Sequence, residues 1–417
     1  MKKQKTLNKI ICLLFLLFSL GGCWDQKEID KRAYVIALGM DKGEKDSIIL
    51  TYLIANPEYG VQQQGGSTNE PPHEIISIES ADFVSSANKA NAVVAKEISY
   101  DLLRNFIISE KLAKEKDFIR WMYDATKERE IRRDSYFIIS KEDASTYIEQ
   151  NQPKLETRAQ KYFDLIITRG IETASIPKAD IHRYLRITEA DSDLFLGIYS
   201  TTEHESKSRD STEGDEILAG QLQTEGLTNK TQFIGSAIFK EGIMIDTLTA
   251  EETRIAILLS VAIKAPEIVT TFPDPFNKRY KVTAKISQLK KIKVQMNLKK
   301  GASTINVILP LHIDILSDYS MVKYASDINK RNELKKHLIE RFEQKMRSFI
   351  KKTQEEYKGE PFGWSLVARK KFATLPEYEK FNWMKSYPDM DVKLSVDIEF
   401  GEFGRQSRIP NLDKMRD

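Results

Sequence analysis

The stretch TINVILPLHIDI, residues 304–315, carries an aliphatic side chain at every second position. Successive side chains of a β-strand point to opposite faces of a sheet, so this alternation predicts a long strand with one buried face. Sheets with one solvated face are most often antiparallel, and we expect antiparallel pairing here. The same period recurs in three further stretches, whose apolar positions are Val282, Ala284 and Ile286; Ile292, Val294, Met296 and Leu298; and Val392, Leu394, Val396, Ile398 and Phe400.

The segment before the last of these strands, Asn332 to Tyr357, has a helical period instead. A single apolar stripe opposite lysine and glutamate predicts a long amphipathic helix that covers the apolar face of the sheet. Gly359 is a suitable stop signal for this helix. The stripe consists of Leu334, Leu338, Phe342, Met346, Phe349 and Ile350.

The stretch FIGSAIFKEGIMIDTLTAEETRIAILL, residues 233–259, predicts two strands around a Glu-Gly turn, followed by a helix. Thr249 is a suitable N-cap for that helix, because Glu252 follows it at the spacing of a capping box. Strands and helices also alternate farther upstream, which favours a mixed α/β domain. The expected elements there are a hairpin (32–41 and 46–57), a strand (73–81), a helix (83–94), a strand leading into a helix (105–115) and a strand (134–142).

These patterns predict an α+β fold, with mixed or antiparallel sheets flanked by helices in two to three lobes. Residues 201–216 contain no aliphatic or aromatic side chain, which indicates a linker or mobile loop, and residues 62–72 read as an exposed loop. The expected divisions are a signal peptide (1–22), an N-terminal α/β domain (24–200), a linker or mobile loop (201–230) and a C-terminal α+β domain (231–417), with room for a further split near residue 280.

The beginning of the chain has the features of a secretory signal peptide. Four lysines precede eleven residues, Ile10 to Leu20, of which only Ser19 is polar, and this run is too short to span a bilayer. A short helix of a cytoplasmic protein is the alternative, but the run Phe15 to Phe18 would leave such a helix without a polar face.

The motif LGGC, residues 20–23, stands at the end of the apolar run and resembles the lipobox of bacterial lipoproteins. That resemblance implies cleavage before Cys23, a diacylglyceryl group on its thiol, and a further acyl chain such as palmitate on the new N-terminus. Two or more acyl chains give a stable anchor, whereas one is marginal. The alternative is ordinary signal cleavage that leaves a cysteine nearby.

Cleavage before Cys23 would leave about 395 residues, enough for two or three domains. It would remove four lysines and no acidic residue, so the formal net charge would fall from +3 to −1, which does not favour a nucleic-acid partner. Cys12, the other cysteine, would leave with the signal peptide. The mature chain would then have no free thiol for catalysis, disulfide formation or metal binding.

Catalytic and metal-binding motifs are weak in this sequence. The five histidines, which share no metal-ligand spacing, are His73, His182, His204, His312 and His337. Ser86 and Lys89 match the Ser-x-x-Lys pattern of penicillin-binding enzymes, but its Lys-Thr-Gly partner is missing, so we expect a chance match. We therefore expect no catalytic residue, no metal site and no cofactor.

Several stretches together resemble one family. GCWDQKEID (22–30) followed by VIALGMD (35–41), then GSAIFKEGIMIDTLTAEETRIAILL (235–259) and EPFGWSLVARKKF (360–372), resemble the Ger(x)C spore germination lipoproteins. These are the C subunits of nutrient germinant receptors. The resemblance spans nearly the whole mature chain and implies a fold of three mixed α/β lobes.

The resemblance implies a non-enzymatic, lipid-anchored subunit on the outer face of the spore inner membrane or cell membrane. Its partners would be an A-type subunit and a B-type integral-membrane subunit of the germinant receptor, and it would serve nutrient-triggered germination. A solute-binding lipoprotein of a transporter is the main alternative, although it should show two parallel βαβ lobes. An envelope hydrolase would need a catalytic constellation, and none is apparent in the sequence.

Overall fold

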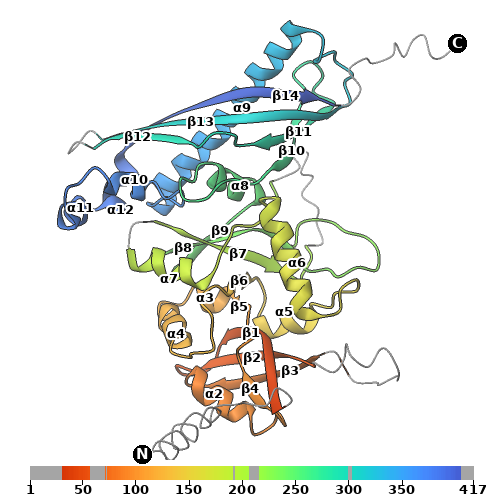
Figure 1. Cartoon of the computed structure of the whole chain (residues 1–417), viewed down its shortest axis with the longest axis vertical. Helices are drawn as coiled ribbons and strands as arrows, with labels where there is room; N and C mark the ends of the chain where they lie inside the picture. The colour runs from red at the N-terminus through yellow and green to blue at the C-terminus, as the bar shows by residue number, and fades with distance from the viewer. Residues whose placement is uncertain are drawn as a thin grey trace, which may run out of the picture.

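The structure, a computed structural model, describes residues 31–56, 71, 73–190, 193–205, 216–298 and 303–404. The described chain forms an elongated body, with β1 toward one end and a second sheet at the opposite end (Figure 1). Two sheets with helices packed against them confirm the expected α+β class. The expected signal peptide lies outside the described residues, as does the expected loop 62–72 except for Pro71.

The first sheet has nine strands in the order β3-β2-β1-β5-β6-β7-β8-β9, with β4 paired to β1. Its centre, from β1 through β5 and β6 to β7, is parallel, and antiparallel strands extend it on both sides. The strands are β1 (Arg32–Lys42), β2 (Ile48–Ala55), β3 (His73–Ser80), β4 (Glu97–Ser99), β5 (Asn105–Ser109), β6 (Tyr136–Ser140), β7 (Phe195–Thr201), β8 (Gln232–Lys240) and β9 (Ile243–Leu248).

The hairpin predicted at the start of this sheet is confirmed, because β1 and β2 pair antiparallel. The strands at 73–80, 105–109 and 136–140 also form as expected. The helix expected over 83–94 is shorter and ends at Ala90. The helices of this half are α2 (Phe83–Ala90), α3 (Glu110–Ala113), α4 (Phe118–Ala125), α5 (Ala144–Gln150), α6 (Ala159–Glu172) and α7 (Ile181–Ala190).

An aromatic cluster fixes α7 against the middle of the first sheet. The rings of Phe137 on β6 and Tyr184 on α7 stack with their centroids 4.7 Å apart, and Phe195 and Phe239 meet both of them edge-on. Tyr184 also donates a hydrogen bond to the carbonyl oxygen of Gly242 at 2.7 Å, so its buried hydroxyl is satisfied. Aromatic contacts of this kind stabilise beyond the area that they bury.

The first sheet continues across the segment that the sequence marks as a linker. β7 pairs antiparallel with β8, whose first residue lies about 30 residues farther along the chain. Within the described part of that segment, Gln232 accepts at its side-chain oxygen from the backbone N–H of Gly220 at 2.8 Å. The division of the chain at 201–230 stays a prediction, but hydrogen bonds join its two sides into one sheet.

Helix α8 (Ala250–Leu258) begins where the capping box predicts. The Thr249 hydroxyl accepts from the backbone N–H of Glu252, and the Glu252 carboxylate accepts from the backbone N–H of Thr249. Two backbone donors that a helix start leaves open are thereby satisfied.

The second sheet contains the stretch with which the sequence analysis began. Its alternating side chains are buried as expected, from Ile305 through Ile315 on β13. The order is β10-β11-β13-β12, with β14 along the other edge of β13. The strands are β10 (Ile268–Pro273), β11 (Lys281–Ser287), β12 (Lys293–Asn297), β13 (Thr304–Asp318) and β14 (Asp391–Phe403).

Strand direction in the second sheet is only partly as expected. β10, β11, β12 and β13 pair antiparallel, but β13 and β14 are parallel over most of their length, so the expectation of antiparallel pairing is wrong for that pair. The long helix α9 (Ile328–Lys352) supplies the reason, since it carries the chain back to the starting end of β13. A crossover helix of this kind is what a parallel pair requires.

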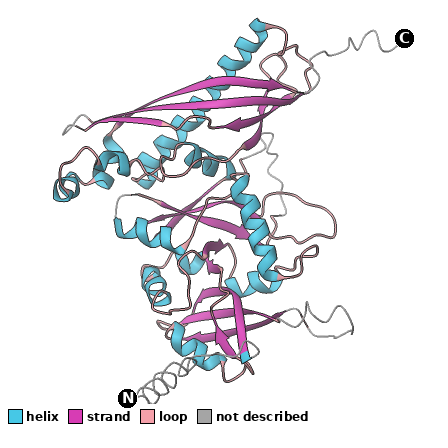
Figure 2. Ribbon diagram, viewed as in Figure 1, coloured by secondary structure: helices cyan, strands magenta, loops and turns pink. Residues whose placement is uncertain are grey.

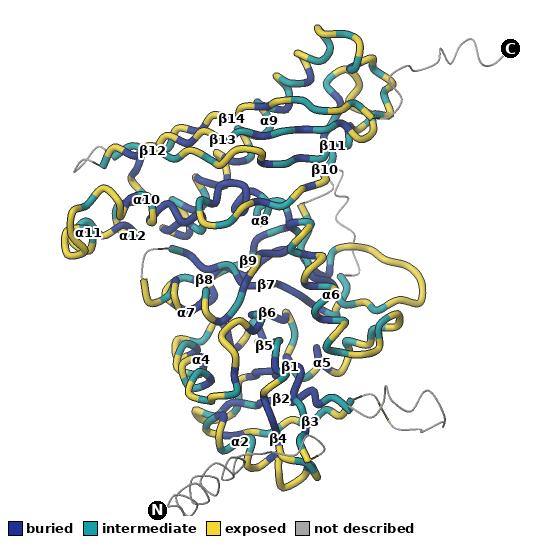
Figure 3. Tube along the Cα trace, viewed as in Figure 1, coloured by how far each residue is buried: buried dark blue, intermediate teal, exposed yellow. Residues whose placement is uncertain are grey.

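Helix α9 crosses one face of the second sheet, as Figure 2 shows. Its predicted stripe is confirmed, because Leu334, Leu338 and Met346 are fully buried. Figure 3 shows buried residues along the inner strands and exposed ones on the outer surfaces of the helices. The remaining elements are the π-helix η3 (Thr353–Tyr357), α10 (Ser365–Arg369), α11 (Leu375–Phe381), α12 (Trp383–Ser386) and the 3-10 helix η4 (Tyr387–Asp389).

The end of this helical segment differs from the expectation in one detail. The left-handed residue is Lys358, with φ of 50°, rather than Gly359. Gly359 is needed for another reason: a Cβ atom there would lie 3.0 Å from Leu194 Cδ2 and 3.1 Å from the Met384 sulfur. The chain therefore turns at Lys358, and Gly359 lies close to Leu194, which immediately precedes β7.

Candidate functional site

The predicted lipidation site, Cys23, lies outside the described residues, which begin at Lys31. Seven residues, 24–30, lie between Cys23 and Lys31. An extended chain covers about 3.3–3.6 Å per residue, so β1 starts within roughly 30 Å of Cys23. Any attachment through Cys23 would therefore act on the β1 end of the body.

The start of β1 is held firmly by charged side chains. The Arg32 guanidinium hydrogen-bonds the Asp101 carboxylate and lies 3.7 Å from a carboxylate oxygen of Glu130. An open groove of about 420 Å³ lies beside it, lined by residues that include Arg32, Ile54, His73 and Lys96. Burial lowers the pKa of the His73 imidazole, so this groove does not gain charge from that histidine at neutral pH.

The Ser-x-x-Lys match does not form a catalytic pair. Ser86 is fully buried, and its oxygen accepts a hydrogen bond from the Tyr52 hydroxyl at 2.8 Å. The Lys89 amine instead donates to the backbone carbonyl of Glu79 at 2.9 Å. The serine is thus a satisfied core residue.

Metal ligands do not gather in the described part of the chain, where no group of three or more His, Cys, Asp or Glu side chains could hold an ion. His204 contacts the carbonyl oxygen of Lys230 at 2.9 Å, and His312 lies 3.5 Å from Asp314. Nor is any described helix both long and apolar enough to cross a bilayer.

A polar junction between the two sheets is the feature that the sequence analysis missed. Asp193 precedes β7 of the first sheet, and Glu360 lies in the loop before α10, which packs with the second sheet. The backbone N–H of Leu194 donates to the carbonyl oxygen of Glu360 at 2.9 Å, which brings the two segments together. These residues are 167 positions apart, and neither stands in a periodic pattern or motif that could have revealed the contact.

Glu360 is fully buried and organises its own loop. One carboxyl oxygen accepts from the backbone N–H of Phe362 at 2.6 Å, and the other accepts from the backbone N–H of Ser365 at 2.9 Å. Trp364 in the same loop donates its indole N–H to the carbonyl oxygen of Leu259 at 3.0 Å. The loop from Glu360 to Ser365 is therefore fixed to the end of α8.

The carboxyl groups of Asp193 and Glu360 share a buried environment that disfavours their charged forms. Desolvation raises the pKa of Glu360 well above its ordinary value, and the negative charge of Asp193 raises it further. Desolvation also raises the pKa of Asp193. Two carboxyl groups that share a buried site retain a proton that neither would keep in water. We therefore expect the stability of the junction to depend on pH.

A second set of contacts links the end of α9 with α8, and η3 with the first sheet. The Lys240 amine donates to the carbonyl oxygens of Tyr357 and Lys358, and the Tyr357 hydroxyl donates to Asp246 at 2.7 Å. Lys352 lies 2.8 Å from the Glu252 carboxylate. An open, strongly charged groove of about 670 Å³ lies along this contact. The two sheets are thus joined at more than one place.

Two family models match the chain on the two sides of residues 202–233. The spore germination protein N-terminal domain matches residues 25–201, and the spore germination B3/GerAC-like C-terminal domain matches residues 234–404. The fold is therefore that of a spore germination protein. More specifically, the chain belongs to the Ger(x)C family, which these two domains define and which is not a known enzyme family.

Individual proteins agree with this assignment. Spore germination protein B3 of Bacillus subtilis (strain 168) is 21% identical over 96% of this chain and 99% of its own length. Spore germination protein KC of the same organism is 29% identical over 33% of this chain and 34% of its own length. The crystal structure of the GerBC protein matches with a TM-score of 0.50 at 16% identity, covering 87% of this chain and 96% of that one.

Proposed function

We propose that this chain is the lipid-anchored C subunit of a nutrient germinant receptor, and that it acts as an adaptor rather than as an enzyme. The match to both domains of the Ger(x)C family carries the proposal. Its partners would be an A-type subunit and a B-type integral-membrane subunit. Its place would be the outer face of the spore inner membrane.

The anchor follows from the lipobox LGGC and from the position of Cys23 before the folded body. Acyl chains contribute about 0.8 kcal/mol per buried methylene, so two or three chains hold a protein stably on a bilayer. A body held in this way meets membrane-embedded partners at a high effective concentration. Weak contacts with those partners would then be sufficient for assembly.

The adaptor role is supported because the Ser-x-x-Lys match does not form a catalytic pair in the folded chain. Ser86 and Lys89 point to different partners, and the Glu360 carboxyl group accepts hydrogen bonds within its own loop. The solute-binding alternative expects two parallel lobes, whereas the second sheet is largely antiparallel.

A germination assay on spores tests the proposal. Three forms of the protein are compared at equal abundance: the wild type, Cys23→Ala, and Cys23→Ala with a foreign transmembrane helix in place of the signal peptide. We expect Cys23→Ala to be released from membranes and to lose the nutrient response, and the foreign helix to restore it. An untethered protein that responds like the wild type would refute adaptor action by proximity.

Crosslinking in native membranes tests the partners separately. A photoreactive residue at the exposed positions Leu155 or Leu227 should capture integral-membrane receptor subunits if those surfaces face them. The same probe at the buried position Leu338 is the control, because it should capture nothing outside this chain. Capture of transporter components instead would favour the solute-binding alternative.

A further inference from the structure

A cavity lies at the junction of the two sheets, with walls from three separate segments of the chain. One wall is α7 with the residues just before it and the start of β7, and the second is the end of α8 with the residues that follow it. The third runs from Pro361 into the first turn of α10 at Leu366. The space open to the centre of a water-sized sphere is about 30 Å³. One water needs only about 10–15 Å³ on that measure, so the cavity has room for a larger group, and it opens to solvent. A ligand in this cavity would touch both halves of the molecule.

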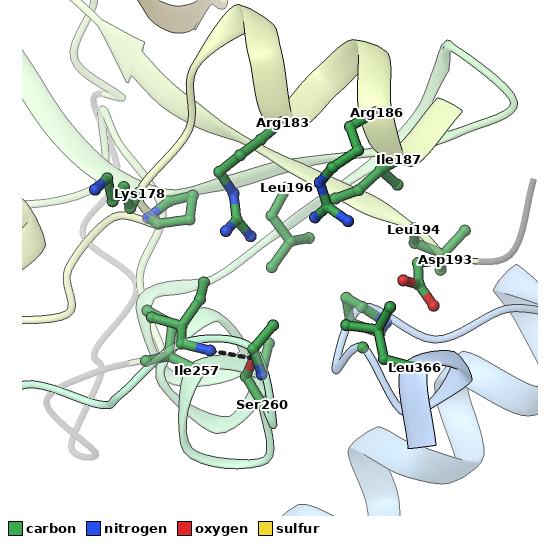
Figure 4. A pocket seen from close by; sticks show the side chains of 16 residues that line it. Lys178, Arg183, Arg186, Ile187, Asp193, Leu194, Leu196, Ile257, Ser260 and Leu366 are labelled. Carbon is green, nitrogen blue, oxygen red and sulfur yellow. Dashed lines mark hydrogen bonds between the residues drawn. The ribbon is translucent and has the colours of Figure 1, made fainter. Parts of the chain in front are cut away.

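Two arginine side chains from α7 point into this cavity, as Figure 4 shows. They are Arg183 and Arg186, which stand three residues apart and therefore lie on the same side of the helix. Lys178 adds a third positive charge at the rim. The planar fork of a guanidinium group matches the oxygens of a carboxylate or phosphate.

The Arg183 guanidinium is not fully satisfied by the described part of the protein. Its Nε atom is buried and has no hydrogen-bond partner there. Burial lowers the pKa of Arg183, and the nearby positive charge of Arg186 lowers it further, while Asp180 and Asp193 act in the opposite direction. A partly buried guanidinium that lacks a hydrogen-bonded anion is costly, and a bound anion would remove that cost.

The opposite wall offers a further hydrogen-bond donor. Ser260 Oγ accepts from the backbone N–H groups of Ala262 and Ile263, each at 3.2 Å. A hydroxyl that accepts two bonds still has its own hydrogen to donate. Ser260 lines the cavity, so this hydrogen can be directed toward a bound oxygen.

Asp193, the only acidic side chain on the described wall, does not neutralise this charge fully, because it faces three basic side chains. The wall therefore carries more positive than negative charge. The rest of the lining is largely apolar, with Ile187, Leu194 and Leu196 near the arginines. An apolar lining strengthens charge interactions inside the cavity because it lowers the local dielectric constant.

We propose that this cavity binds a small oxyanion, a carboxylate or phosphate group, between Arg183 and Arg186 on α7 and the Ser260 hydroxyl beyond α8. The volume admits the charged head of a ligand and places any larger remainder at the open side. Binding would link α7 to the end of α8 and so stabilise the junction between the two sheets. The inference is independent of the receptor function proposed above.

The test uses the purified full chain in detergent and measures its melting temperature with increasing sodium phosphate or sodium acetate. Sodium chloride at equal ionic strength is the salt control. We expect a saturable rise with at least one oxyanion that chloride does not reproduce, because a ligand that binds only the folded state stabilises it. A response to acetate alone identifies a carboxylate site, a response to phosphate alone identifies a phosphate site, and both support the proposal.

Three variants decide whether the effect belongs to this cavity. Arg183→Gln and Arg186→Gln should each weaken binding about tenfold or more, because each removes a charge-assisted contact. Arg169→Gln on α6 is the matched control, since that side chain is 74% exposed and pairs with Glu172, and it should leave binding unchanged. Arg186 is exposed in the absence of ligand, so its variant should fold even if Arg183→Gln does not. The proposal is overturned if neither oxyanion gives a saturable effect, or if the cavity variants bind like the wild type.

Discussion

Replacement of Leu338 by Asp should destabilise the C-terminal part of the protein strongly. Leu338 is fully buried in the stripe by which α9 packs on the second sheet. Truncation of a buried leucine costs about 2.7–5.0 kcal/mol in well-packed cores, and a buried carboxyl without a partner adds to this loss. At roughly 2–4 °C per kcal/mol for a unit of 150–250 residues, a loss of about 3 kcal/mol lowers the melting temperature by about 6–12 °C.

Tryptophan fluorescence during thermal unfolding can follow this change. Trp364 and Trp383 are buried in the same core as Leu338, so their emission reports on that core. Leu338→Ala should give the truncation cost alone, and Lys336→Asp controls for an added acid on the exposed side of the same helix. An unchanged melting temperature for Leu338→Asp would show that the stripe does not face the sheet.

Three further predictions concern the junction and the first sheet. The pKa values of Asp193 and Glu360 are raised, so the folded chain keeps a proton that the unfolded chain releases above about pH 4. The free energy of unfolding should therefore fall as pH rises, by up to about 1.4 kcal/mol per pH unit for one proton. Asp193→Asn should flatten this dependence in melting curves between pH 4 and 8, and an unchanged slope would contradict the coupling. Gly235 has φ of +88°, and an added Cβ would lie 2.4 Å from the carbonyl oxygen of Leu248, so Gly235→Ala should cost about 2 kcal/mol or more. Gly226 also has a positive φ, of +106°, but no atom lies within 4 Å of an added Cβ. Gly226→Ala therefore has the backbone strain without the steric clash and should cost less in denaturant titrations. Thr249→Ala removes the cap of α8 and should cost about 1 kcal/mol in the same titration; a loss no larger than that of a surface substitution would show that the cap does not stabilise α8.

Local features of the fold could be read from the sequence because their causes are local. The alternation at 304–315 and the stripe from Leu334 to Ile350 follow from side-chain geometry within a single element. The capping box at Thr249 depends on residues only three positions apart. The family resemblance could likewise be seen in short motifs, and the two domain matches confirm it.

The tertiary structure decided which elements meet. A strand's own period does not specify its neighbour, so the parallel pairing of β13 with β14 and the pairing of β7 with β8 across the polar segment came only from the folded chain. The meeting of Asp193 with Glu360, and the cavity beside Arg183, had no periodic or motif signal either. Such polar contacts depend on how whole sheets pack, because a single charged residue looks the same in sequence whether it is buried at a junction or exposed to solvent.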